Sequence, residues 1–485
     1  MDDVIGRIPK QLFIDGKWQD SADGSTFGVD DPGNEQRLCE IADGQSADAE
    51  AAVEAAVTAQ ESWARTPPRE RGEILRRAFE LMTERADELA LLMTLEMGKS
   101  LKESRAEVIY AAEFFRWFSE EAVRIDGRYS PNPAGGGRTI VTRQPVGPCL
   151  LVTPWNFPLA MGTRKIGPAV AAGCTMIVKP PQLTPLSMLN LAALLTEAGL
   201  PDGVLNVVSS TSATRIVNPV LGDARVRKMS FTGSTEVGRK LVEQCAPNLQ
   251  RMSMELGGNA PFLVFADADL DAAVQGAVTA KMRNNGESCV AANRFHVAEP
   301  VAEEFTRRLT EKMAGLRIGH GTEEGVSVGP LISDGQRDKV IELVGDALDR
   351  GATATTGGEP LDGKGFFYRP TVLSGVPEGA RILREEVFGP VAPITTFTDE
   401  DEAVALAGDT EFGLVGYLFT RDLDRAIRVG EALPTGMVGI NTGLVSNPAA
   451  PFGGVKASGF GREGGHEGID EYLDTKYLAV AVGAH

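Results

Sequence analysis

Cysteine is scarce in this sequence, and its distribution excludes two classes of protein. The five cysteines, Cys39, Cys149, Cys174, Cys245 and Cys289, are odd in number, far apart and never in a CxxC pair. A disulfide framework and a zinc site are therefore not expected. We predict no metal site of any kind.

Basic residues and long apolar runs are also in short supply. Lys and Arg total 48 against 67 Asp and Glu, a net charge of −19, with no basic cluster. Nucleic acid and anionic membrane surfaces are therefore not expected as partners. No apolar run has the length of a membrane-spanning helix, and the acidic segment 1–7 lacks the pattern of a secretory signal. We expect a cytoplasmic protein.

What the chain does contain is the pattern of an α/β protein. Its 485 residues, 42% of them hydrophobic, suffice for about three domains. Helical spacing dominates 47–122, and an exposed strand is expected at 139–144. From 147 to 245, short apolar runs alternate with helical segments, which is typical of a parallel sheet. A second α/β region begins near Gly257, and a final strand is expected at 471–482.

Cys289 is the cysteine best placed to react. It lies in a polar loop between a predicted helix and a predicted strand, and a thiolate needs such a partly open setting. An inert structural cysteine is the alternative. A histidine-activated hydrolase is weakly supported, because His296 falls inside a predicted strand and His485 is the last residue.

Two further polar residues follow predicted strands. Glu255 precedes a Gly-Gly turn, at the carboxyl end of a strand, where the sites of α/β proteins assemble, so it is a candidate base. A solvated turn carboxylate is the alternative. Asn156 lies between two aromatic residues and two prolines in 153–158, which suits a fixed donor as well as a simple rigid turn.

The segment 231–240 follows a strand and opens a helix, an arrangement that holds phosphate groups. It is not a Walker A loop, because Arg239 and Lys240 stand where that motif needs Lys and then Ser or Thr. It is not the GxGxxG fingerprint either. Any dinucleotide would be bound in a variant way.

Six segments in this order resemble the aldehyde dehydrogenase superfamily over essentially the whole chain. They are 154–158 (PWNFP), 231–234 (FTGS), 254–258 (MELGG), 286–289 (GESC), 385–390 (EEVFGP) and 451–454 (PFGG). The resemblance implies a Rossmann-like cofactor domain (1–125 and 146–256), a catalytic α/β domain (257–465) and a small β oligomerisation arm (126–145 and 466–485). A homodimer or homotetramer is implied.

The resemblance also implies roles for individual residues. Cys289 would attack an aldehyde, Asn156 would hold the oxyanion, and Glu255 would activate water to hydrolyse the thioester. The residues implied for the nicotinamide cofactor are Thr153, Trp155, Lys179, Gln182, Gly233, Ser234, Glu386 and Phe388. Many relatives carry glutamate where this chain has Gln182, and a neutral amide does not repel a 2′-phosphate. We therefore expect NADP to be favoured over NAD.

Local details are most similar to the succinate-semialdehyde branch of the family, which implies that Arg164, Arg283 and Ser446 bind a carboxylate at the far end of the substrate. Guanidinium groups bind carboxylates bidentately. Another carboxylated semialdehyde, such as glutarate semialdehyde, is the alternative substrate. A non-catalytic scaffold is an alternative of another class, and cofactor-independent ester hydrolysis is a possible side activity.

Two departures from the family pattern have chemical consequences. Ala291 stands where some relatives carry a second cysteine, so a regulatory disulfide with Cys289 is not expected. Glu287 stands where glutamine is common, and we expect its negative charge to raise the pKa of the Cys289 thiol.

Overall fold

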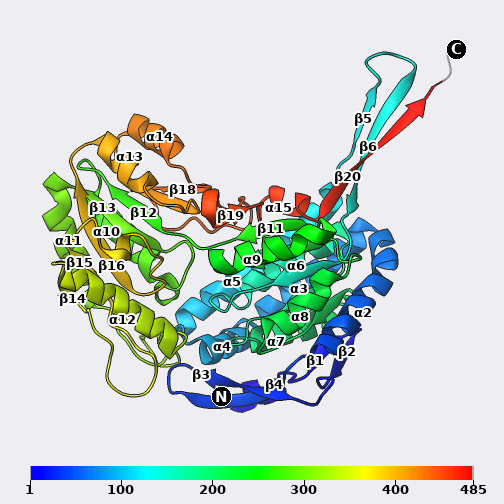
Figure 1. The fold of residues 1–485 in the computed structure, drawn as a ribbon, viewed down its shortest axis with the longest axis horizontal. Coiled ribbons are helices and arrows are strands. Elements are labelled where there is room, and N and C mark those ends of the chain that lie inside the picture. Colours follow the sequence, from blue (N-terminus) through cyan, green and yellow to red (C-terminus); the bar gives the residue numbers. More distant parts are fainter. Residues whose placement is uncertain (1, 483–485) are drawn as a thin grey trace.

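The computed structural model describes residues 2–482, so His485 lies outside the described residues. Two α/β units lie side by side, and a long β arm projects away from them (Figure 1). The C-terminal strand runs out along this arm, whereas the N-terminal segment lies at the opposite side of the molecule.

The first unit is built on an eight-stranded sheet in the order β19-β11-β10-β7-β8-β9-β1-β2. Strands β7 to β11 are parallel to one another. Strands β1, β2 and β19, at the two edges of the sheet, pair antiparallel with their neighbours. The strands are β1 (Leu12–Ile14), β2 (Lys17–Gln19), β7 (Cys149–Val152), β8 (Met176–Lys179), β9 (Leu205–Val207), β10 (Lys228–Thr232), β11 (Arg251–Glu255) and β19 (Gly459–Phe460).

Helices cover both faces of this sheet. They are α2 (Ser46–Arg65), α3 (Pro68–Glu84), α4 (Ala86–Met97), α5 (Leu101–Glu121), α6 (Ala160–Ala172), α7 (Leu186–Glu197), α8 (Ala213–Gly222) and α9 (Thr235–Cys245), preceded by α1 (Asp2–Arg7). Successive side chains of β7 point to opposite faces of the sheet and so belong to two separate parts of the core. Cys149 and Leu151 pack with α3 to α7, whereas Leu150 and Val152 pack with α2, α8 and α9. The result is a three-layer α/β/α unit.

The second unit is built on a seven-stranded sheet in the order β14-β15-β16-β13-β12-β17-β18. Its strands are β12 (Ala260–Val264), β13 (Ala292–Ala298), β14 (Thr353–Thr356), β15 (Thr371–Ser374), β16 (Val391–Phe397), β17 (Val415–Phe419) and β18 (Met437–Ile440). Its helices are α10 (Leu270–Met282), α11 (Glu299–Ala314), α12 (Asp334–Asp349), α13 (Glu400–Gly408) and α14 (Leu423–Ala432). All strands except β14 pair in parallel, so the predicted second α/β region is present.

The arm is a three-stranded antiparallel sheet. It consists of β5 (Arg128–Pro131), β6 (Gly137–Pro145) and β20 (Leu473–Ala481), of which β20 follows the short α15 (Glu467–Asp470). The predicted pairing of the strand at Thr139 with the C-terminal strand is confirmed, with Thr139 opposite Ala479. A separate hairpin, β3 (Thr26–Asp31) with β4 (Gln36–Ala42), lies near the N-terminal segment (Figure 1).

Some boundaries differ from the sequence-based expectation. The sequence of 225–231 predicts a strand over that whole range, but β10 begins at Lys228, because Asp223 forms a turn that accepts hydrogen bonds from the backbone N–H groups of Arg225 and Val226. The segment 257–465 supplies the whole second sheet but also returns β19 to the first sheet. Within residues 2–482, no helix combines the length and apolar character needed to cross a bilayer.

Candidate active site

The carboxyl ends of four adjacent strands in the first sheet carry the predicted site residues. Lys179 ends β8, Glu255 ends β11, Ser234 follows β10, and Asn156 follows β7. Because β8, β7, β10 and β11 are consecutive parallel neighbours, these ends meet at one edge of the sheet. Ser234 is also the N-cap of α9, and its Oγ accepts a hydrogen bond from Val237 N–H at 3.4 Å.

The Cys289 loop comes from the second unit and lies directly before β13. Ala291 N–H donates to the Ser288 carbonyl, and the Tyr417 hydroxyl donates to the Val290 carbonyl at 2.8 Å, so the turn is held on both sides of the cysteine. Gly258 passes close by: a Cβ at this position would come within 2.7 Å of the Cys289 carbonyl oxygen. This contact explains the need for glycine there.

A cavity of about 220 Å³ lies between the two units and brings most of the predicted residues together. Its lining includes Trp155, Asn156, Gly233, Ser234, Glu255, Cys289, Glu386 and Phe388 from the predicted set, and also Met161, Thr232, Gln336 and Lys339. The thiol, the carboxylate and the amide therefore face one space. Sequence reasoning missed Gln336 and Lys339, which belong to no recognisable motif.

The Cys289 thiol is held protonated. Its side chain is half-buried, and burial is the largest cause that raises its pKa, to about 12. Glu386 and Glu255 raise the pKa further, whereas Arg164 and Arg283 oppose them. Ionisation of this thiol therefore depends on charges that line the cavity.

The pKa of the Cys289 thiol is raised, but the expectation that the negative charge of Glu287 raises it is wrong. Glu287 is fully buried, and its Oε1 accepts a hydrogen bond from Ile332 N–H at 3.0 Å. Burial raises the pKa of Glu287 well above its ordinary value and so favours the neutral form of its carboxyl group. Burial of the thiol itself is the main cause, which a polar loop in the sequence does not reveal.

Glu255 has an unusual environment for a carboxyl group. It is 2% exposed, and neither of its oxygens has a hydrogen-bond partner among residues 2–482. Burial raises its pKa well above the ordinary value, and Glu463 adds to the shift, whereas Arg164 and Lys165 oppose it. A raised pKa makes the ionised carboxylate a stronger proton acceptor, which suits a base that activates water.

Asn156 is fixed from several sides. Its Nδ2 donates to the Glu287 carbonyl at 3.0 Å, and its Oδ1 accepts from Phe157 N–H at 3.1 Å. Its backbone carbonyl accepts from Lys99 Nζ at 2.8 Å and from Asn284 Nδ2 at 2.9 Å. The second Nδ2 proton is not needed for these bonds, so a preorganised donor remains for the cavity.

Phe388 and Glu386, from the loop before β16, also line the cavity of about 220 Å³. Phe388 meets Trp155 edge to face, with ring centroids 5.4 Å apart, and adopts a positive φ of 52°. Glu386 Oε1 accepts a hydrogen bond from Gly258 N–H at 3.1 Å. Burial raises the pKa of Glu386 to about 7, and the charges of Lys339 and Lys281 counteract this rise.

The remaining predicted cofactor residues lie beyond this cavity. Lys179 is buried, and burial lowers its pKa to about 8 despite the opposing charge of Asp43. Thr153, whose N–H bonds the Lys179 carbonyl at 3.3 Å, has a buried Oγ1 with no partner in the described chain. Gln182 is exposed and lines another hollow beside β3, and no hydrogen bond joins it to Lys179 in the described chain.

The three predicted carboxylate-binding residues converge on a second, smaller cavity. Arg164, Arg283 and Ser446 line it together with Cys289 and with the aromatic residues Tyr110, Phe157 and Phe452. Arg283 Nη1 donates to Ser446 Oγ at 2.7 Å, and its guanidinium lies 5.0 Å from the Phe157 ring centre. Cations and aromatic faces of this kind suit a short anionic chain.

Arg164 has a partner that the sequence did not reveal. Its guanidinium forms a buried ion pair with Glu463, and Glu463 also pairs with Lys165 Nζ at 2.5 Å. Arg164 Nη2 is buried without a partner in the described chain, and the guanidinium lies 4.2 Å from the Phe452 ring centre. No local motif marks Glu463, because the contact joins positions about 300 residues apart.

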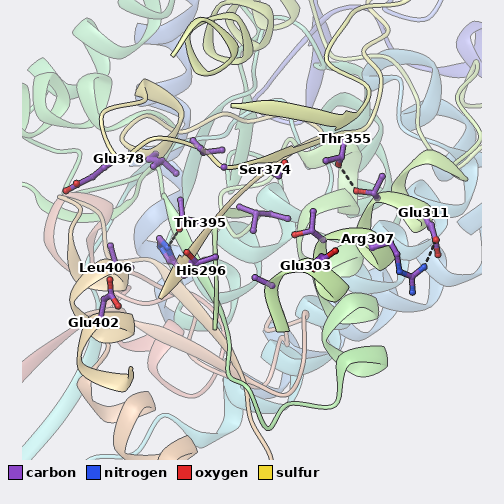
Figure 2. Close-up of a pocket in the computed structure, with 18 residues that line it drawn as sticks. His296, Glu303, Arg307, Glu311, Thr355, Ser374, Glu378, Thr395, Glu402 and Leu406 are labelled. Atoms are coloured by element: carbon purple, nitrogen blue, oxygen red, sulfur yellow. Dashed lines mark hydrogen bonds and ion pairs between the residues drawn. The ribbon is translucent and has the colours of Figure 1, made fainter. Parts of the chain in front are cut away.

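A separate cavity of about 1000 Å³ is lined by none of the predicted catalytic, cofactor-binding or substrate-binding residues. Figure 2 shows His296 there, with Nδ1 2.7 Å from Thr395 Oγ1, among glutamates and threonines of the second unit. Burial and the charge of Arg294 lower the pKa of His296 to about 3, so it does not serve Cys289. His320 and His466 pair with Asp31 and Glu121, away from the thiol.

Fold and site together define a two-unit α/β enzyme with a cysteine, a buried carboxyl group and a fixed amide in one cavity. The Aldehyde dehydrogenase family model matches residues 18–478, and the chain belongs to this family. It is 60% identical to a succinate-semialdehyde dehydrogenase of Paenarthrobacter nicotinovorans over 92% of this chain and 99% of that protein. It is 50% identical to a glutarate-semialdehyde dehydrogenase of Pseudomonas putida over 98% of each chain.

The fold of solved relatives agrees with this assignment. The crystal structure of an E. coli NADP dependent enzyme superimposes with a TM-score of 0.97, at 48% identity and over 99% of both chains. The protein is therefore an oxidoreductase of the aldehyde dehydrogenase fold.

Proposed function

We propose that the protein oxidises succinate semialdehyde to succinate with NAD(P)⁺ and favours NADP⁺. The observation that carries this proposal is the convergence of Arg164, Arg283 and Ser446 on a cavity that also contains Cys289. An aldehyde bound at the thiol would place a carboxylate, a few bonds away, beside two guanidinium groups. The name of the relative from Paenarthrobacter nicotinovorans supports the same substrate.

The cavity of about 220 Å³ that contains Cys289 and Glu255 has a lining that suits a nicotinamide cofactor. When bound, this cofactor supplies the hydride acceptor. The start of α9 offers backbone N–H groups and a favourable dipole for a pyrophosphate beside Ser234. Glu386 offers carboxylate oxygens for a ribose, and Trp155 and Phe388 offer apolar walls for a ring. The buried Thr153 Oγ1 and Thr232 Oγ1, which lack partners in the described chain, add donors and acceptors along the same path.

Three residues of the chain carry the chemistry in this proposal. The Cys289 thiol gives its proton to bulk water and its sulfur attacks the aldehyde carbon, while Asn156 Nδ2–H and the Cys289 backbone N–H hold the oxygen that becomes negative. After oxidation of this adduct to a thioester, Glu255 takes a proton from water. The water oxygen then bonds the acyl carbon, the carbon–sulfur bond breaks, and the carboxylic acid leaves.

Lys179 and Gln182 underlie the proposed preference for NADP⁺. Lys179 ends β8, where burial lowers the pKa of its ammonium to about 8 and Asp43 is the charged group that counteracts this shift. A 2′-phosphate would supply a further counter-charge, whereas Gln182 offers no carboxylate to repel it. The NADP dependence of the E. coli enzyme supports this preference.

Glutarate semialdehyde is a second candidate substrate, favoured by the Pseudomonas putida relative. The two substrates differ by one methylene, a difference worth about 1 to 3 kcal/mol in a pocket. We expect activity on both. The aromatic walls Tyr110, Phe157 and Phe452 limit the length of chain that fits between Cys289 and the arginines.

The arm supports an oligomer of this chain, a homodimer or homotetramer. Along β20, every residue after Leu473 is exposed, including the apolar Tyr477, Leu478 and Val480. Exposed apolar strands are rarely left uncovered in a stable protein. Analytical ultracentrifugation of the whole chain tests this assignment, and a monomer at micromolar concentration would contradict it.

The direct test of the activity is product analysis. Purified protein, succinate semialdehyde and NADP⁺ should yield one succinate for each NADPH, and Cys289→Ser should abolish both products. Cys245→Ser, on the far side of α9, is a matched control that should retain activity. Absence of succinate with either cofactor would refute the proposal.

A further inference from the structure

Lys281 is a fully buried lysine that the reaction above does not use. It lies in the last turn of α10 with a side-chain exposure of 0%. In the described chain its Nζ hydrogen-bonds only to uncharged groups, Asn293 Oδ1 and the Gly389 carbonyl, which is rare for a buried ammonium. Burial lowers its pKa to about 7, and Glu386 is the charged group that counteracts this shift.

The hydrogen bonds of Lys281 join segments on both sides of the proposed active site. Its Nζ donates to Asn293 Oδ1 at 3.0 Å and to the Gly389 carbonyl at 3.3 Å. Asn293 lies in β13, directly after the Cys289 turn. Gly389 belongs to the loop 385–390, which also carries Glu386 and Phe388.

The Gly389 carbonyl, which accepts the hydrogen bond from Lys281, is in close contact with the Cys289 loop. A Cβ on Gly286 would come within 2.3 Å of the Gly389 oxygen, so the two loops touch at this point. Phe388, one residue earlier, is held at a positive φ, a conformation that needs support from its surroundings. Lys281 supplies such support through its hydrogen bond to the carbonyl of the next residue, Gly389.

We propose that Lys281 is a positioning residue for the cofactor. Its ammonium fixes the loop 385–390 against the Cys289 loop through Gly389, and its charge keeps the Glu386 carboxylate ionised. Lys339 and Gly258 N–H are the other groups that favour the ionised form of Glu386. This inference rests on the proposed cofactor site, but not on the identity of the aldehyde.

Lys281→Met tests the inference, because methionine has a similar shape without the charge and the two groups that Lys281 Nζ bonds are themselves uncharged. Binding of NADP⁺ to the whole protein is measured by isothermal titration calorimetry at pH 6.5 and pH 8.5. We expect Kd to rise about tenfold at pH 6.5 and less at pH 8.5, where Glu386 ionises without help. Lys312→Met, an exposed lysine of α11, is the matched control and should bind as the native protein does.

A second reaction separates positioning from general damage. Alkylation of Cys289 by iodoacetamide without cofactor, measured at pH 8.5, where Glu386 is ionised in both proteins, should proceed at the native rate in Lys281→Met. Lys281→Gln, which keeps a hydrogen-bond donor, should show the same pH-dependent loss and serves if the methionine variant does not fold. Unchanged Kd at both pH values, or an equal loss in alkylation, would overturn the inference. Failure of the native protein to bind NADP⁺ would instead refute the proposed cofactor site.

Discussion

Arg283 Nη1 lies 2.7 Å from Ser446 Oγ, although 163 positions separate the two residues in the chain. The bond aims a guanidinium group at the cavity that contains Cys289. It leaves the other nitrogens of Arg283 available to a ligand, whereas Arg164 is already paired with Glu463. Arg283 is therefore the side chain on which selection for a carboxylated aldehyde depends most.

Asn156→Ala removes the fixed amide donor. We expect kcat for succinate semialdehyde to fall about a hundredfold to a thousandfold, the typical effect of losing one oxyanion donor. Steady-state kinetics measures this fall. Alkylation of Cys289 by iodoacetamide forms no oxyanion and should be unaffected; an equal loss there would mean that the substitution disturbs the loop instead.

Glu255→Gln removes the base but keeps the size of the side chain. Stopped-flow absorbance should still show one equivalent of reduced cofactor in the first turnover, followed by turnover about 10² to 10⁴ times slower than native. Because the pKa of Glu255 is raised, native deacylation should accelerate as pH rises beyond the ordinary titration range of a carboxyl group. A mutant with no first turnover would assign Glu255 to an earlier step.

Glu287→Gln tests the origin of the raised thiol pKa. Since burial is the main cause and the neutral form of the Glu287 carboxyl is favoured, iodoacetamide should alkylate native and mutant proteins with the same alkaline pH profile. The rate should keep rising toward the thiol pKa of about 12. If the pH profile of alkylation moved to lower pH in the mutant, the negative charge of Glu287 would be a cause of the raised thiol pKa after all.

His320 links the second unit to the β3–β4 hairpin through Asp31, with Nε2 2.8 Å from Oδ2. The hydrogen bond to Asp31 raises the pKa of His320. The pair therefore stabilises the fold fully below the ordinary histidine pKa of about 6.5, and this contribution is lost as pH rises through the raised value. His320→Gln should lower Tm more at pH 6 than at pH 9, as calorimetry would measure; equal losses would mean that the charge contributes nothing.

Much of the fold follows from the sequence because its signals are local. Alternating apolar runs and helical segments between 147 and 245 predict the parallel strands, and the Thr139 strand predicts the arm. Helix α8 has apolar residues at helical spacing, but Pro219 inside the segment argues against a helix there. Residues at strand ends, such as Glu255 and Asn156, are also foreseeable because a parallel sheet places its carboxyl ends together.

The unforeseen parts of the site depend on contacts between distant segments. Glu463 reaches Arg164 and Lys165 only because β19 returns to the first sheet beside β11. Lys281 looks like an ordinary helical lysine until the loop at Gly389 covers it. Glu287 stands in a polar segment, and nothing local shows that its carboxyl group points into the protein.

The central claim is that the cavity beside Cys289 selects an aldehyde with a carboxylate at its far end. The most direct test is the ratio of kcat/KM for succinate semialdehyde to that for butanal, measured with NADP⁺ in native protein and in Arg283→Met. We predict a large ratio in native protein. In the mutant it should fall about 30-fold to 1,000-fold, the equivalent of about 2 to 4 kcal/mol for a lost buried charge pair, with butanal oxidation little changed. Equal kcat/KM values for the two aldehydes in the native protein would contradict the account.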